Sequence, residues 1–254
     1  MLRLPLIAAL AVCAVAGTLA YARDLGEAGA SEPLDDIAWS YRPAADAQSR
    51  PLLELKRAGM TSMFDPNDLP DVMRELAAVP PDQGAATGFR LVREAGTLVC
   101  TGRATGAGHA AAGTCRFDPD QRFLAALAER GLSPEDNEDM LALALVDARL
   151  ASVDGLSRAG YRLADADDLM AVSALDVSPA FAVELRGAGL VAKDIEDLVT
   201  ARALEIDAAW VQGMAEAGYP NLGMEQAIQF RALDVTPDYA RRMTRVMRGM
   251  EGTE

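Results

Sequence analysis

Basic residues are scarce in this sequence. Its 254 residues contain 24 Lys and Arg against 38 Asp and Glu, which gives a formal net charge of −14. A chain this acidic repels nucleic-acid phosphates unless it carries a concentrated basic patch, and the sequence analysis identifies none. We therefore expect no nucleic-acid partner. Half of the residues are hydrophobic, which excludes wholesale disorder and leaves room for one or two folded domains.

Histidine is almost absent. His109 is the only one, so the chain cannot build a His-rich zinc site or the H-E-x-x-H motif of zinc peptidases. The sequence has no G-x-S-x-G, and its Gly-rich stretch at 102–113 lacks the G-x-x-x-x-G-K-[ST] phosphate loop. We expect His109 to lie in a solvated loop. The sequence predicts no catalytic residue, cofactor or metal, and thus not an enzyme.

The N-terminal 22 residues have the features of a secretory signal peptide. A basic start at Arg3 precedes an apolar stretch, and Ala20-Tyr21-Ala22 is a small-x-small site that predicts cleavage between Ala22 and Arg23. The stretch is also long enough for the alternative, an uncleaved anchor in the inner membrane. Both alternatives export the rest of the chain, to the periplasm or beyond, and no later segment is apolar enough to span a membrane.

Cysteine is too rare for a disulfide-dense scaffold. Cys13 lies in the predicted signal, which leaves Cys100 and Cys115. An even pair in an exported chain predicts a disulfide. The two residues are separated by more than the C-x-x-C spacing of redox-active pairs, so a structural bridge between facing strands is the preferred interpretation.

The region before residue 118 divides into two predicted parts. Residues 23–50 are rich in Asp, Glu, Ala, Pro and Ser and are predicted to be a linker, with one apolar cluster at 37–41 that could dock on the body. Residues 51–117 are predicted as a small α+β region. It would hold short helices at 52–59 and 69–76, followed by an antiparallel meander of three strands within 88–117.

Residues 118–250 contain a repeat of 29 residues, about four and a half copies long. Its clearest column consists of Gly131, Gly160, Gly189 and Gly218, predicted to end a helix in the left-handed conformation. An apolar column precedes the glycines by eight residues, at Phe123, Ser152, Phe181 and Trp210. An acidic column follows them by sixteen, at Asp147, Asp176, Glu205 and Asp234. Each copy would form two short helices, and neighbouring copies must stack to bury their apolar faces.

Further columns predict how the helices begin. Most residues that lie eleven before the glycines are good N-caps, the exception being Arg149. Acidic clusters at 135–139 and 165–168 lie where each second helix would start, and we interpret them as caps rather than as calcium ligands. The aromatic residues of the repeat are predicted to be core. Together the patterns predict a mainly α fold, a short α-solenoid preceded by a small β meander.

The repeat resembles short two-helix repeats of bacterial envelope proteins, with the pattern A-L-D-V-S-P-x-F-x3-L-x3-G. Some of these repeats are appended to antibiotic-sensing zinc metallopeptidases and to anti-sigma-like regulators. The pattern stands here at 174–181 and again at 232–239, and the segment around Glu94–Thr97 and Phe117–Pro119 is similar to the Gly-punctuated β segment that often precedes them. The likeness covers about residues 88–247. The sequence has no counterpart of the peptidase, so the resemblance implies an interaction or sensing module and no catalytic residue.

These expectations give one function hypothesis and two alternatives. The first is a non-enzymatic periplasmic interaction module with a protein partner in the cell envelope. The second is a cryptic envelope hydrolase or a small-ligand-binding protein with its site near His109. The third is a structural envelope protein with acidic faces bridged by calcium.

Overall fold

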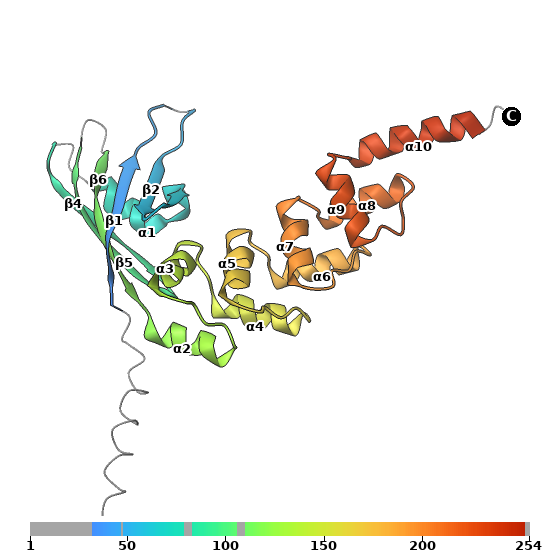
Figure 1. Ribbon diagram of the computed structural model, residues 1–254. Coiled ribbons are helices and arrows are strands. Elements are labelled where there is room, and N and C mark those ends of the chain that lie inside the picture. Colours follow the sequence, from blue (N-terminus) through green and yellow to red (C-terminus); the bar gives the residue numbers. More distant parts are fainter. Residues whose placement is uncertain (1–31, 47, 79–82, 106–109, 252–254) are drawn as a thin grey trace, which may run out of the picture.

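The computed structural model describes residues 32–46, 48–78, 83–105 and 110–251, which form a six-stranded sheet and a long helical arm (Figure 1). The expected mainly α solenoid is therefore wrong as a fold class, and the protein is mixed α/β. Strands that the sequence patterns missed account for the difference, because half of the sheet lies before residue 65.

The sheet is antiparallel throughout. Its spatial order is β3-β2-β1-β6-β5-β4. The strands are β1 (Leu34–Arg42), β2 (Leu52–Arg57), β3 (Met60–Phe64), β4 (Ala86–Arg93), β5 (Gly96–Ala104) and β6 (Ala111–Pro119). The predicted three-stranded meander is present as β4, β5 and β6, but it is only half of the sheet.

Strand β1 corrects the prediction of a linker at 23–50. Ile37, Trp39 and Tyr41 alternate with exposed or partly exposed residues and are buried in the core, which is the period of two expected for a strand with one covered face. The apolar cluster at 37–41 thus docks on the body as a central strand, hydrogen-bonded to both β2 and β6.

The helix predicted at 52–59 is also wrong. Leu53 and Leu55 point to the same face of strand β2, and the chain reverses at Ala58 and Gly59, both with positive φ, to return as β3. The helix predicted at 69–76 is present as α1 (Pro70–Ala77), after a short 3₁₀ turn at Pro66–Asp68. Helix α1 packs on β4 and contributes Val72 and Leu76 to the core.

The predicted disulfide is confirmed. Cys100 on β5 lies directly opposite Cys115 on β6, and the two sulfurs are bonded. Both residues lie on the buried face of the sheet together with Phe89, Leu98 and Phe117. That face is covered by α1 and by the first part of the helical arm.

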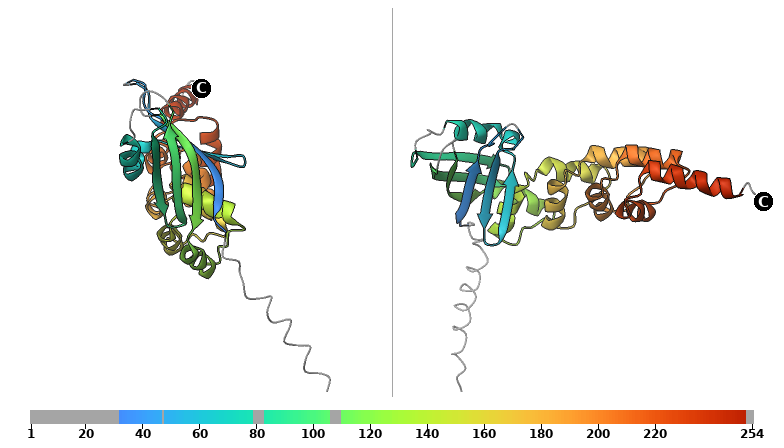
Figure 2. Two further views of the ribbon diagram at one scale, coloured as in Figure 1. Left: turned by 90° about the vertical axis from the view of Figure 1, so that its left-hand side faces the viewer. Right: turned by 90° about the horizontal axis from the view of Figure 1, so that it is seen from above.

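The arm consists of helix pairs that repeat every 29 residues. The first helices are α2 (Gln121–Glu129), α4 (Leu150–Arg158), α6 (Pro179–Gly187), α8 (Ala208–Glu216) and α10 (Pro237–Glu251). The second helices are α3 (Asn137–Leu145), α5 (Ala166–Ala174), α7 (Ile195–Ala203) and α9 (Met224–Ala232). Each first helix packs on the next first helix, and each second helix on the next second helix. The arm leaves one face of the sheet and carries α10 at its far end (Figures 1 and 2).

Each helix of a pair ends at a residue in the left-handed conformation. The four predicted cap glycines have φ of 78° at Gly131, 96° at Gly160, 95° at Gly189 and 108° at Gly218. The acidic column does the same for the second helices, with φ of 53° to 55° at Asp147, Asp176, Glu205 and Asp234. Asp is among the few side chains that tolerate this conformation. The sequence showed the acidic column but did not predict this role.

The sheet closes the first end of the arm. Helix α3 packs on β5 and β6. Arg149, the one poor N-cap of its column, has no side-chain cap bond, and Glu94 from the β4–β5 turn accepts the backbone N–H of Leu150 instead at 2.9 Å. Arg93 on β4 forms an ion pair with Asp147. The β4–β5 hairpin therefore supplies groups that a preceding repeat would otherwise provide.

The predicted helix caps are otherwise present. Asp120, Ser178 and Asp207 cap first helices through their side chains. Asp136, Asp165 and Asp194 cap second helices. In the acidic clusters at 135–139 and 165–168, four carboxylates accept backbone N–H groups: Asp136, Asp139, Asp165 and Asp168. Among the described residues, no group of three or more His, Cys, Asp or Glu side chains is placed to hold a metal.

Replacing both disulfide cysteines by alanine should lower the free energy of unfolding by about 3 kcal/mol, because the bridge closes a loop of 15 residues in the unfolded chain. Denaturant unfolding of the double variant and the parent measures the difference. The parent under reducing conditions should behave like the variant. Equal stability of parent and variant would contradict a stabilising role.

Gly189→Val should destabilise the protein by more than about 1 kcal/mol, because a β-branched residue is strained at φ of 95°. Gly187→Val is the matched control. Gly187 lies in helix α6 with helical φ and open space around its Cα, so the same side chain there should change stability by no more than about 0.5 kcal/mol. Thermal unfolding compares the two, and equal effects would refute the left-handed cap.

Asp154→Asn should destabilise the protein near neutral pH but not in acid. Arg130 forms two hydrogen bonds with Asp154, of 2.8 and 2.9 Å, which join α2 to α4 and hold the pKa of Asp154 below its ordinary value. A lowered pKa in the folded state stabilises the fold above the unfolded pKa of about 3.9 and ceases to do so as the pH falls through the folded pKa. Melting temperatures of parent and variant should therefore differ at pH 7 and converge below about pH 4. The exposed Asp167→Asn serves as the control, and a difference independent of pH would contradict the ionic origin.

Candidate functional site

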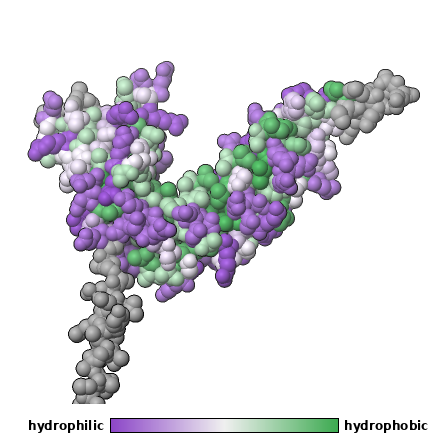
Figure 3. Space-filling view, in the orientation of Figure 1, coloured by the Kyte–Doolittle hydropathy of each residue, from purple (hydrophilic) through white to green (hydrophobic). Residues whose placement is uncertain are grey.

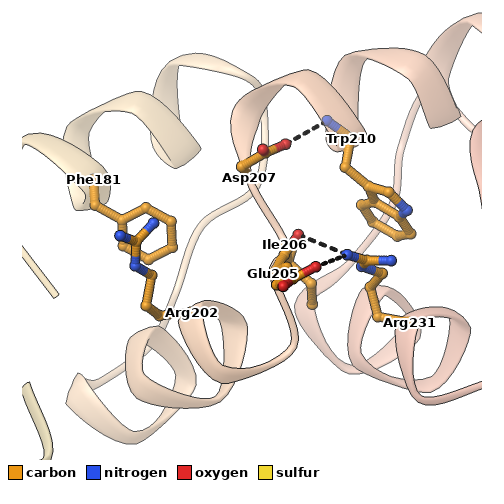
Figure 4. A pocket seen from close by; sticks show the side chains of 7 residues that line it. All are labelled: Phe181, Arg202, Glu205, Ile206, Asp207, Trp210 and Arg231. Carbon is orange, nitrogen blue, oxygen red and sulfur yellow. Dashed lines mark hydrogen bonds and ion pairs between the residues drawn. The ribbon is translucent and has the colours of Figure 1, made fainter. Parts of the chain in front are cut away.

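The candidate site is an open pocket of about 520 Å³ between the third and fourth repeats (Figure 4). Its walls come from the facing helices of the two copies and from the α7–α8 connection. The lining residues are Phe181 on α6, Arg202 on α7, Glu205, Ile206 and Asp207 in the connection, Trp210 on α8 and Arg231 on α9.

The repeat register explains why the pocket has this chemistry here. Phe181 and Trp210 occupy the same column of successive copies, and so do Arg202 and Arg231. One copy earlier, the corresponding positions hold Ser152 and Ser173. Among the described repeats, only the third and fourth copies have both an aromatic residue in the first of these columns and an arginine in the second.

Arg202 has hydrogen-bond donors available to a ligand. Its Nε donates to the carbonyl of Leu175 at 3.0 Å, and its guanidinium lies over the Phe181 ring, 5.3 Å from the centroid. The nearest ionic partner is the Asp176 carboxylate at 3.6 Å, on a side chain that is 89% exposed. An exposed ion pair of this kind contributes little stability, so a ligand carboxylate can displace it.

Arg231 forms the fixed wall of the pocket. One terminal nitrogen donates to the backbone carbonyl of Glu205 at 3.2 Å and to its carboxylate at 3.1 Å. The adjacent Trp210 forms two hydrogen bonds. Its backbone N–H donates to the Asp207 carboxylate at 2.7 Å, and its indole N–H donates to the carbonyl of Val235 at 3.2 Å. Figure 4 shows Trp210 and Arg231 on the same side of the pocket, with Phe181 and Arg202 across from them.

The pocket is balanced in charge, with two guanidinium groups and two carboxylates. The Asp207 carboxylate is occupied by the helix N-terminus, and Glu205 is paired with Arg231. Arg231 Nε also lacks a partner but is buried, so Arg202, whose side chain is 39% exposed against 17% for Arg231, is the more accessible binding group. Its planar fork suits a carboxylate oxygen pair, and the rings beside it suit an apolar segment. No Ser, Cys, His or Lys lies among these lining residues.

The sequence-predicted sites have different outcomes. Cys100 and Cys115 are bonded, and the four cap glycines have the expected conformation. The signal cleavage site at Ala22 and Arg23, and His109, lie outside the described residues. No helix that the structure describes is both long enough and apolar enough to cross a membrane.

The pocket itself was missed by sequence analysis. Phe181 and Trp210 are each 7% exposed, so their prediction as core residues holds for most of each side chain while part of each lines the pocket. The sequence does contain a signal for the pocket. Arg202 and Arg231 are one repeat apart, and so are the aromatic residues that precede them, Phe181 and Trp210. Comparison of the chain with protein-family models, curated proteins and solved structures gave no match.

Proposed function

We propose that the protein is a non-enzymatic interaction module of the cell envelope that binds a carboxylate-bearing segment of a partner protein in the Arg202 pocket. One observation carries the proposal. The Arg202 guanidinium is stacked on Phe181, anchored through Nε only, and next to a displaceable, solvent-exposed Asp176.

The rest of the arm supports binding along its length. Stacked repeats create an extended surface suited to binding, and the pocket lies on that surface between the third and fourth copies. The disulfide fits an oxidising compartment, in line with the predicted export to the periplasm or beyond. The resemblance to envelope repeats favours the same class of function.

In-cell crosslinking of the tagged protein, followed by quantitative mass spectrometry, tests the proposal. Arg202→Ala should reduce recovery of a specific envelope partner at least tenfold, since it removes the ligand-facing donors. Arg202→Lys should not restore recovery, because an ammonium group cannot form a two-pronged contact with a carboxylate. Arg122→Ala, an exposed arginine on α2, is the matched control and should leave recovery unchanged.

Two outcomes would contradict the proposal. One is equal recovery of the partner with Arg202→Ala and the parent, which would move the binding surface elsewhere. The other is turnover of an envelope substrate by the purified protein that a point mutation abolishes, which would make it an enzyme. His109→Ala distinguishes the hydrolase alternative, because only that alternative expects the variant to lose function.

A further inference from the structure

The far end of the arm differs from every earlier repeat. Helix α10 has 15 residues, whereas each of the other helices in the arm has nine. Met247 occupies the position of the cap glycine, and the helix continues through it to Glu251. Helix α10 therefore continues through the position at which the chain reverses in the earlier copies, at Gly131, Gly160, Gly189 and Gly218.

This missing reversal leaves an apolar groove of about 420 Å³ beside α10. Its wall residues come from α9, α10 and the connections before and after α9: Gly218, Tyr219, Phe230, Val235, Tyr239, Ala240, Met243 and Thr244. We call this surface the terminal groove. Tyr219 and Phe230 meet edge to face in it, with ring centroids 5.3 Å apart.

The repeat shows what normally covers this surface. Tyr239 and Met243 are 46% and 43% exposed, whereas Trp210 and Met214, which hold the same columns one copy earlier, are 7% and 0% exposed. Trp210 is covered by Arg231 of α9 and by the backbone that follows α9. In the fourth copy, groups from the second helix and from the connection after it lie beside this position, and among the described residues no equivalent groups lie beside Tyr239.

The terminal groove is preformed. On its inner side, α10 buries Ala240 and donates a hydrogen bond from the Thr244 hydroxyl to the carbonyl of Ala217, at 2.9 Å. Pro237 packs against Gly213 of α8. Leu233 and Val246 add exposed apolar surface, and Figure 3 shows hydrophobic surface where α9 meets α10. An incoming helix would meet a rigid apolar surface with little ordering cost.

Helix α10 is also basic, in contrast to the chain as a whole. It has four arginines, at 241, 242, 245 and 248, against Asp238 and Glu251. The corresponding positions of α8 that the structure describes hold Gln212, Gly213 and Glu216. This cluster is the basic patch that sequence analysis overlooked. Arg242 lies over the Tyr239 ring, 5.9 Å from its centroid, at the groove.

We infer that the terminal groove binds an amphipathic helix with an acidic first turn, supplied by a partner protein. The chain's own second helices show the type. Helix α5 begins at the N-cap Asp165, continues with Asp167 and Asp168, and buries Leu169 and Val172. A helix of this kind would place apolar side chains on Tyr239 and Met243 and carboxylates near the arginines of α10. Two copies of α10 would instead oppose like charges, which disfavours pairing of this chain with itself.

This inference concerns a different surface from the Arg202 pocket and does not depend on it. A fluorescently labelled peptide with the sequence of residues 161–177, which contains one Arg and four Asp, is the probe. Anisotropy should show saturable binding to the full protein. Met243→Asp should weaken binding at least tenfold because it places a charge in the apolar groove, and Arg242→Glu should weaken it because it reverses the favourable charge.

Matched controls separate the groove from other surfaces. Val183→Asp, at an exposed valine on α6, should leave peptide binding unchanged. A peptide of the same composition in scrambled order should not bind. Circular dichroism checks that the Met243→Asp variant is folded. We expect it to fold because Met243 is 43% exposed in the parent.

Three results would overturn the inference. The first is no binding of the 161–177 peptide, or binding that Met243→Asp does not change. The second is concentration-dependent dimerisation in sedimentation experiments that Met243→Asp abolishes, which would make a second copy the occupant. The third is binding to vesicles rich in anionic phosphatidylglycerol that the same variant abolishes, which would make the groove a membrane contact.

Discussion

The arm depends on stacking, because none of its repeated helices is long enough to be stable alone. Helices α2 to α9 have nine residues each, below the length at which an isolated helix forms in water. Each buries its apolar face against neighbouring copies and, for α3, also against the sheet. The reversals at the left-handed glycines and acidic residues keep those copies in register, and every other feature of the arm follows from this requirement.

The acidic reversals bring a cost that the arginines offset. A carboxylate at the C-terminal end of a helix faces the negative end of the helix dipole, and the chain places one there in each second helix. Arg202 pairs with Asp176 and Arg231 with Glu205, each from the following copy. Ser173 stands where the arginine for Asp147 would be, and Arg93 of the sheet forms that ion pair instead. The arginines of the pocket thus belong to the series of ion pairs that joins successive copies. We propose Arg202 as the binding group because its ion pair is the longer and more exposed of the two.

The sequence predicted where the helices of the arm begin and end better than it predicted the fold class of the whole protein. Gly131 and its equivalents were identified because their even spacing is accompanied by further columns at fixed offsets, and a glycine at the end of each helix has a clear physical explanation. Strand β1 was missed because Ile37, Trp39 and Tyr41 lie among acidic and proline-rich neighbours that resemble a linker, and only its pairing with β2 and β6 gives the short alternation its meaning. The leucines between Leu52 and Leu55 fit the period of a helix as well as that of a strand, so their pattern alone did not identify β2. The Arg202 pocket required knowing which columns of adjacent copies face each other, which spacing does not reveal.

The two ends of the stack show how a repeat array becomes directional. At the first end, the sheet supplies what a preceding copy would have supplied, namely an apolar surface for α3, a cap from Glu94 and a cation from Arg93. A stack needs both ends covered. At the other end, α10 continues past Met247, and the surface that α9 covers one copy earlier stays open beside a cluster of arginines. The first end of the stack is thus covered by the sheet, whereas at the far end Tyr239 and Met243 stay nearly half exposed among the described residues.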